Sequence, residues 1–94
     1  MMIGACTVQL YLPGVFSLKE KRSRLKPILI DLHRRFNVAA VEIDNQDVWQ
    51  SASIAIVAVA NESTLIYSVL EKAVHWIDEN RFDVEIVDWI VELR

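Results

Sequence analysis

The sequence has few of the residues that build disulfide scaffolds, metal sites and nucleotide-binding loops. Its 94 residues include one cysteine, two glycines, two prolines and two histidines. The lone cysteine, Cys6, excludes zinc ribbons and disulfide frameworks and suits a reducing cytoplasm. With only Gly4 and Gly14, the chain cannot form the glycine-rich phosphate loop of Walker or Rossmann proteins.

Long apolar runs are also missing. No stretch approaches the roughly 18 apolar residues of a membrane-spanning helix. The first 14 residues contain no basic segment and include Gln9 and Pro13, which is unlike a signal peptide. We therefore expect a cytoplasmic protein with no membrane partner.

The histidines do not form a metal-binding pattern. His33 and His75 fall in different predicted helices, and neither has a cysteine or a second histidine at ligand spacing. Cys6 alternates with apolar positions, which predicts a small buried side chain rather than a nucleophile. We expect no metal, no cofactor and no catalytic residue.

The composition is that of one small folded unit. Hydrophobic residues make up 53% of the chain and charged residues 24%. These values predict a single domain over residues 1–94. A domain of this size buries roughly 60–65% of its extended surface and has a net stability of about 5–14 kcal/mol.

Charge is distributed unevenly along an acidic chain. The formal net charge is −3, but residues 1–35 hold seven cations and two acids, and residues 36–94 hold three cations and eleven acids. A polyanion would be repelled by most of this surface, so it can only dock locally at the basic segment. The alternative is that the basic run is simply the solvated face of a helix.

Periodicity predicts the order strand, helix, strand, strand, helix, strand. Alternation and β-branched residues favour strands, and apolar side chains at helical spacing favour helices. The predicted strands are residues 3–12, 38–44, 51–60 and 82–93, and the predicted helices run from Ser17 to about Phe36 and from an Asn61 cap to about residue 80. The last strand carries acids on both faces, which is typical of an edge strand or a bulged one.

Two local signals mark the first helix. Ser17 stands three residues before Glu20, which is the spacing of a capping box. Pro27 falls inside the helix, where it removes a backbone hydrogen bond. We expect one bent helix, with a break near Lys26 as the alternative.

This order of elements predicts an α+β fold of the ferredoxin-like βαββαβ type. Four strands form an antiparallel sheet, both helices cover one face, and the first and third strands lie in the centre. The start of the first helix, the loop over residues 45–50 and the end of the second helix then share one edge of the domain. Residues distant in the sequence therefore meet there.

Cations gather at this edge in an unfavourable place. Lys19, Lys21 and Arg22 lie in the first turns of the first helix, at the positive end of its dipole, and Lys26 follows further along. Free amide groups, the dipole and these cations all attract a phosphate. Exposed and screened side chains that bind nothing are the alternative.

The adjacent loop supplies groups that recognise bases. Asn45, Gln46 and Gln50 offer amides that hydrogen-bond base edges, and Trp49 offers a stacking surface. Trp49 closing the end of the core, with Asp47 capping the turn, is the alternative. The candidate site for an anion or nucleic acid therefore comprises Lys19, Lys21, Arg22, Lys26, Asn45, Gln46, Trp49 and Gln50.

The segments 17–22, 35–38 and 45–50, which read SLKEKR, RFNV and NQDVWQ, closely resemble the YlxP-like family of small bacterial proteins. The resemblance covers nearly the whole chain. It implies a ferredoxin-like fold and, because the family's genes commonly lie among those for translation initiation and ribosome-binding factors, a link to the ribosome or RNA. Members often carry histidine where Asn45 stands, and an amide there cannot exchange protons. The family has no established catalytic residues to carry over.

These observations favour a non-catalytic module that binds RNA or the ribosome. The alternative is a homodimeric structural or protein-interaction domain with no nucleic-acid ligand, paired through the uncovered face of its sheet. A third possibility is an enzyme acting on a phosphorylated small molecule, which needs a closed pocket and a metal held near Asp44 or Asp47.

Overall fold

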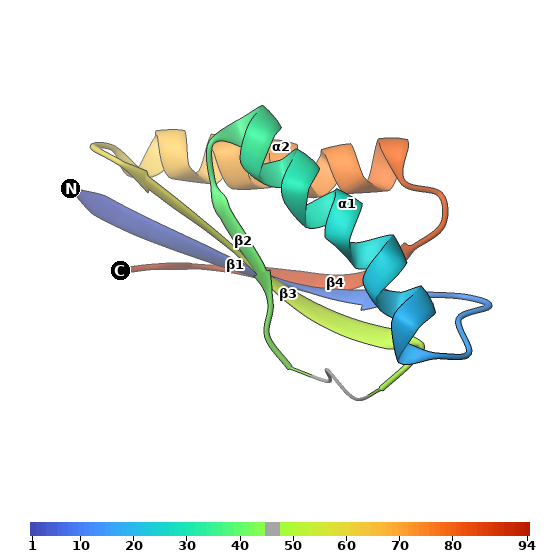
Figure 1. Ribbon diagram of the computed structural model, residues 1–94. Coiled ribbons are helices and arrows are strands. Elements are labelled where there is room, and N and C mark those ends of the chain that lie inside the picture. The colour runs from blue at the N-terminus through green and yellow to red at the C-terminus, as the bar shows by residue number, and fades with distance from the viewer. Residues whose placement is uncertain (45–47) are drawn as a thin grey trace.

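A computed structural model describes residues 1–44 and 48–94 (Figure 1). The strands are β1 (Met2–Tyr11), β2 (Ala39–Glu42), β3 (Ser51–Ala60) and β4 (Glu85–Leu93), and the helices are α1 (Leu18–Phe36) and α2 (Ser63–Asn80). The four strands form one antiparallel sheet in the order β2-β3-β1-β4. The predicted α+β ferredoxin-like fold, with the first and third strands in the centre, is confirmed.

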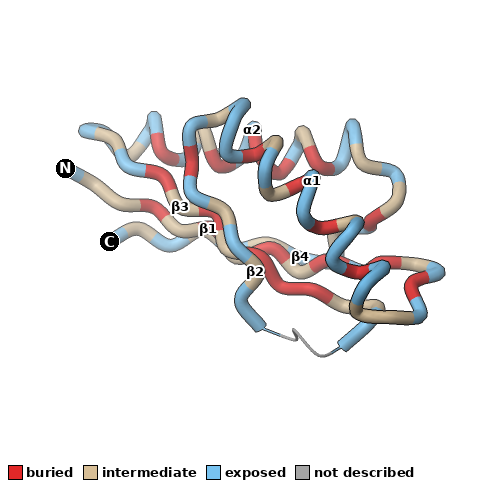
Figure 2. Tube along the Cα trace, in the orientation of Figure 1, coloured by how far each residue is buried: buried red, intermediate tan, exposed pale blue. Residues whose placement is uncertain are grey.

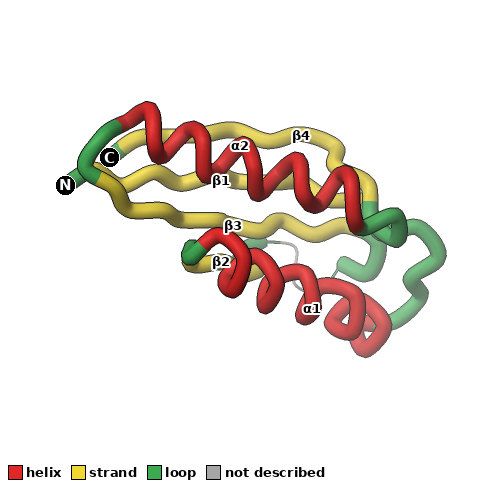
Figure 3. Tube along the Cα trace, turned by 90° about the horizontal axis from the view of Figure 1, so that it is seen from above, coloured by secondary structure: helices red, strands yellow, loops and turns green. Residues whose placement is uncertain are grey.

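Both helices lie on the same face of the sheet (Figures 1 and 3). α2 packs on β1, β3 and β4, whereas α1 packs on β2 and touches α2. In the described part of the chain, neither helix has the length and apolar character needed to cross a membrane. The opposite face of the sheet carries no helix.

The core lies between the sheet and the helices, where Figure 2 shows the buried residues. Along β1 every second residue is buried, namely Gly4, Cys6, Val8 and Leu10, as the period-two pattern predicts. Burial raises the pKa of the Cys6 thiol to about 11, so this cysteine is a neutral apolar side chain at neutral pH. A Cβ at Gly4 would overlap the side chain of Ile66, so glycine lets α2 approach β1 closely.

α1 begins with half of the predicted capping box. Ser17 Oγ accepts a hydrogen bond from the Glu20 amide at 3.1 Å, and Glu20 Oε2 accepts one from the Phe16 amide at 3.3 Å rather than from that of Ser17. The helix continues through Pro27 to Phe36, so the alternative of a break near Lys26 is wrong. Asn37 ends the helix in the left-handed conformation, with φ 53° and ψ 47°.

The structure corrects three predicted boundaries. α2 is capped by the extended residue Glu62 and not by Asn61, and Glu62 makes no side-chain cap hydrogen bond. β2 covers only Ala39–Glu42, and β4 begins at Glu85 rather than at residue 82. Because residues 81–84 turn the chain back from α2 to the sheet, their apolar members do not add to the strand.

β4 is both an edge strand and a bulged strand. Gln9 pairs with Asp88, whereas Leu10 pairs with Ile86, so Val87 is the extra residue of the bulge. The shift explains why the acids of this strand do not follow strict alternation in the sequence.

Two arginines join the β1–α1 loop to the start of β4. Arg24 Nη1 donates to the carbonyl oxygens of Pro13 at 2.6 Å and Asp83 at 2.8 Å. Arg81 Nη2 forms an ion pair with Asp83 Oδ2 at 2.9 Å within the turn before β4, and it donates to the Arg24 carbonyl oxygen of α1 at 3.5 Å. These contacts hold the start of α1 near the end of α2, as the topology predicts.

The Arg81–Asp83 pair should make stability depend on pH in acid. The hydrogen bond from Arg81 lowers the pKa of the Asp83 carboxyl, with further help from the charges of Arg81 and Arg24 and against partial burial. A lowered folded-state pKa adds stability above the usual aspartate value of about 3.9, and this is lost as pH falls through the folded-state value. Because the pair is partly exposed, we expect Asp83→Asn to cost about 0.2–1 kcal/mol near pH 7.

Urea unfolding of the wild type and Asp83→Asn between pH 7 and pH 2.5 measures this effect. The difference between the two proteins should shrink below about pH 4. A difference that stays constant down to the lowest pH would show that the Asp83 charge adds no stability.

Candidate functional site

The start of α1 and the segment before β3 meet at one edge, as the topology predicts. Lys21 Nζ donates to the carbonyl oxygen of Val48 at 2.7 Å. Gln50 Nε2 donates to the carbonyl oxygen of Val15 at 3.1 Å, and the Gln50 carbonyl accepts from the Leu12 amide at 2.9 Å. Of the eight predicted site residues, six lie in the described ranges; Asn45 and Gln46 lie outside them, as does Asp47.

Lys21 belongs to the interior and not to the surface. Its side chain is 1% exposed, and Nζ lies 2.9 Å from Glu42 Oε2. Lys21 stands four residues before Leu25 and seven before Ile28, so it continues the buried stripe of α1. Lys21 is predicted as part of an anion-binding surface, but its side chain is buried, and its helical spacing from Leu25 and Ile28 already indicated that position.

The opposite charges of Lys21 on α1 and Glu42 on β2 compensate each other between the helix and the sheet. Glu42 pairs with Ile54 of β3, and this register puts its side chain on the helix side of the sheet. Within the described residues, buried Glu42 Oε2 accepts no aligned hydrogen bond, so its contact with Lys21 is an ion pair by distance. Such a pair, together with the bond to Val48, fixes α1 against β2 and the segment that follows it.

Three other predicted cations do share a surface. Lys19, Arg22 and Lys26 are exposed, and their spacing of three and four residues places them on one side of α1. We call these three residues the cationic face. Arg24 is excluded from it because its guanidinium is partly buried and bonds two backbone carbonyls.

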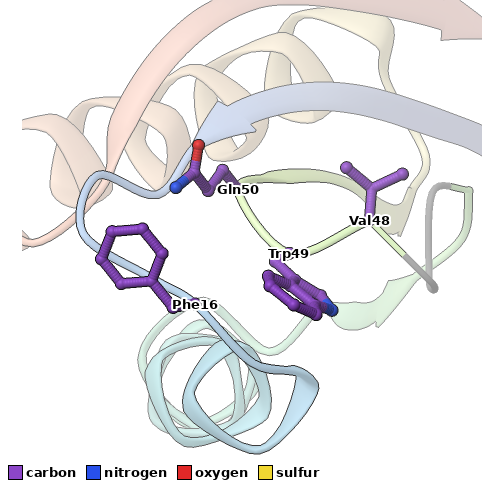
Figure 4. A pocket seen from close by; sticks show the side chains of 4 residues that line it. All are labelled: Phe16, Val48, Trp49 and Gln50. Atoms are coloured by element: carbon purple, nitrogen blue, oxygen red, sulfur yellow. The ribbon is translucent and has the colours of Figure 1, made fainter.

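An open hollow lies beside the first turn of α1. It has a volume of about 440 Å³ and is lined by Phe16, Val48, Trp49 and Gln50. Figure 4 shows the rings of Phe16 and Trp49 on two sides of it. Phe16 is 66% exposed and Trp49 is 49% exposed, so Trp49 does not simply close the core.

Sequence reasoning missed Phe16. The residue precedes the cap Ser17, where a hydrophobic side chain usually packs against the fourth helical residue. Here that residue is Lys21, whose side chain is occupied by Glu42 and Val48. Phe16 is exposed because position 21 offers it no apolar partner. The lysine at this position of the sequence was therefore the signal that could have identified Phe16.

The backbone at the start of α1 is less available than expected. The Glu20 amide already donates a hydrogen bond to Ser17 Oγ. This amide is one of the first-turn donors that a phosphate would use. An anion at this edge must therefore depend mainly on side-chain cations. Gln50 also has a positioning role, because its amide nitrogen bonds Val15.

The arrangement offers little of what phosphoryl chemistry requires. The hollow is open and lined mainly by aromatic and aliphatic side chains. Within residues 1–44 and 48–94, no three metal-ligating side chains gather. Asp44 is exposed.

Comparisons with known proteins agree with the predicted resemblance. Residues 3–91 match the family described as "Protein of unknown function (DUF503)". The chain is 38% identical over 77 residues to the "Uncharacterized protein YlxP" of Bacillus subtilis (strain 168), a match that covers 82% of this chain and 84% of the relative.

Solved structures share the fold at low sequence identity. An acylphosphatase from Bacillus subtilis has a TM-score of 0.53 and 15% identity, with 100% of this chain and 86% of that chain covered. A de novo designed protein with a ferredoxin fold has a TM-score of 0.59 and 11% identity, with 100% of this chain and 84% of that chain covered. At these identities the likeness concerns the fold alone.

Proposed function

The chain belongs to the DUF503 family of proteins of unknown function, and we propose that it is a non-catalytic module that binds single-stranded RNA. The binding surface is the cationic face together with the hollow between Phe16 and Trp49. The gene neighbourhood implied by the family resemblance favours the ribosome as the source of this RNA.

The observation that carries the proposal is a pair of exposed aromatic rings at the start of the helix that carries the exposed cations. Proteins that bind single strands stack bases on aromatic side chains and hold the backbone with lysine and arginine. Neighbours on the cationic face are about 5–6 Å apart at their Cβ atoms, so their side chains can reach successive phosphates. Because Phe16 immediately precedes the cap Ser17, a base stacked on its ring lies near the first turn of α1, where the cationic face begins with Lys19.

The acidity of the remaining surface limits the mode of binding. Residues 36–94 hold eleven acids against three cations, so RNA cannot wrap around the domain without repulsion. Only a few phosphates are neutralised at the cationic face. We therefore expect weak binding that decreases as salt increases.

Trp49→Ala should weaken binding to a short single-stranded RNA. Loss of one stacked base costs about 1–3 kcal/mol, which corresponds to a rise in Kd of about 5- to 150-fold. The probe is a fluorescein-labelled oligouridine of about ten nucleotides, within the usual site size, and its anisotropy gives Kd. Thermal unfolding of the variant checks that the half-exposed ring is not needed for the fold.

Tyr67→Ala is the matched control. Tyr67 is 40% exposed on α2, far along the chain from the hollow, and α2 begins at the opposite end of the domain (Figure 1). We expect its Kd to stay close to that of the wild type. Equal losses in the two variants, or no loss in Trp49→Ala, would remove the hollow from the binding site.

A further inference from the structure

The face of the sheet that no helix covers combines apolar side chains with acids. We call it the open sheet face. Val41 of β2 is 50% exposed, Val59 of β3 is 62% exposed and Ile90 of β4 is 57% exposed. Contiguous exposed apolar surface of this kind is characteristic of an interaction site.

The acids lie in a single column along β4. Glu85 pairs with Tyr11, Asp88 with Gln9 and Glu92 with Ala5, and all three acids are exposed. These β1 partners occupy the positions between the buried residues of that strand, so the acids point to the open sheet face. We call these three residues the acidic column.

Positive charge is scarce on this face. Arg94 bonds the backbone of Ile3 and so continues the same face, where its guanidinium lies 3.4 Å from Glu92. Elsewhere among the described residues of the four strands, the open sheet face carries uncharged side chains. A ligand that covers it must supply both apolar surface and cations.

We infer that the open sheet face docks a basic amphipathic helix of another protein. The apolar stripe of such a helix covers the valines and isoleucines of the sheet, and its flanking lysines or arginines lie along the acidic column. Complementary charge sets the orientation and the rate of association, whereas the apolar contact supplies most of the affinity. The proposed RNA surface comprises the cationic face of α1, which lies in the other layer, and the hollow beside the first turn of α1, and it shares no residue with the acidic column.

The dimensions suit one helix. β1 has ten residues, which corresponds to about 33 Å of strand. From Glu85 to Glu92 the acidic column extends over about 20 Å. A partner helix follows this column for about 13 residues, or three to four turns.

A second copy of this chain is a poorer occupant. Two copies packed face to face with a twofold axis along the strands would set the acidic column against β2, where Val41 is exposed. With the axis across the strands, the column would face its own copy. Both arrangements bury Glu85 and Asp88, and the cation placed on this face, Arg94, already lies beside Glu92.

The test uses a synthetic leucine–lysine helix of about 18 residues, whose cations flank an apolar stripe. The triple variant Glu85→Gln, Asp88→Asn, Glu92→Gln removes the column and keeps Asp88 Oδ1 as an acceptor for the Trp89 amide. The control triple, Glu71→Gln, Asp78→Asn, Glu79→Gln, removes three exposed acids from α2. Ile90→Ser removes apolar contact from the same face.

We expect the column variant to raise the Kd of the peptide about tenfold at low salt and Ile90→Ser to raise it as well. The control should bind like the wild type, and a glutamate–leucine helix should not bind. Equal loss in both triple variants would overturn the inference. So would a wild-type dimer in sedimentation equilibrium that Ile90→Ser dissociates, because this outcome assigns the face to a second copy. RNA binding that the column variant changes much more than the control triple does would also overturn it, because both variants change the net charge equally and the difference would assign the face to RNA.

Discussion

Lys21→Ala is expected to lower the free energy of unfolding by about 3–5 kcal/mol, because it leaves a largely buried carboxylate without its partner. Lys21 is 1% exposed and Glu42 is 18% exposed, so water compensates little of the loss. The change also removes the bond from Nζ to the Val48 carbonyl. The net free energy of unfolding of a domain of this size is about 5–14 kcal/mol, so much of its stability depends on this residue.

Urea unfolding followed by circular dichroism measures the loss, and two variants make it interpretable. Lys19→Ala removes an exposed cation two residues away and should change stability by less than about 0.5 kcal/mol. The double variant Lys21→Met, Glu42→Leu replaces the ion pair by apolar side chains and should recover most of the stability. A Lys21→Ala protein as stable as Lys19→Ala would contradict the buried pair.

The double variant also separates the two roles considered for Lys21. If the ammonium group only fixes α1 to β2, the folded double variant binds RNA as the wild type does. A Kd weakened as strongly as in a cationic-face variant would instead mean that Lys21 contacts the phosphates and that its burial changes on binding.

Neutralising the cationic face should abolish most RNA binding. Each phosphate contact on a single strand contributes about 0.7 to the slope of log K against log salt. Removal of three contacts should therefore reduce that slope by about 2 and raise Kd by about 10²–10³-fold at 50 mM salt. The variant is Lys19→Gln, Arg22→Gln, Lys26→Gln, and Kd is measured for oligouridine between 50 mM and 200 mM salt.

The control removes the same charge from elsewhere. Arg34→Gln, Lys72→Gln, Arg94→Gln also neutralises three exposed cations, so the net charge changes equally. We expect the Kd for oligouridine to rise less than about threefold, because the long-range electrostatic field becomes weaker. If the two triple variants lose affinity equally, RNA responds to net charge and not to the cationic face.

The fold was predictable because the spacing of apolar residues fixes the buried face of each element and the order of elements allows few topologies. The alternation in β1 and the apolar stripe of α1 each allow only one buried face, and right-handed crossovers then fix the order of strands. The boundaries were less predictable. β4 begins late because residues 81–84 form a turn that is bonded to Arg24. Arg24 donates to the Asp83 carbonyl oxygen and its own carbonyl oxygen accepts from Arg81, and both contacts span nearly sixty residues.

The candidate site was only partly predictable for a similar reason. Charge alone assigned Lys21 to the surface, although its spacing relative to Leu25 and Ile28 places it in the core. Its partner Glu42 is distant in sequence, so no local pattern shows that the charge is compensated. Phe16 is exposed as a consequence of that burial, and it was therefore missed as well.

The three tryptophans of the chain allow a direct test of the proposed RNA surface by NMR. Trp49 lines the hollow beside α1, Trp76 packs against Phe36, and Trp89 of β4 lines a second pocket together with residues of α2. In a ¹H–¹⁵N spectrum titrated with oligouridine, the Trp49 indole signal and the amides near Phe16 and Lys19 should shift while the other two indole signals stay in place. An unchanged Trp49 signal, or shifts centred on Trp89 or on the open sheet face, would contradict RNA binding at this edge.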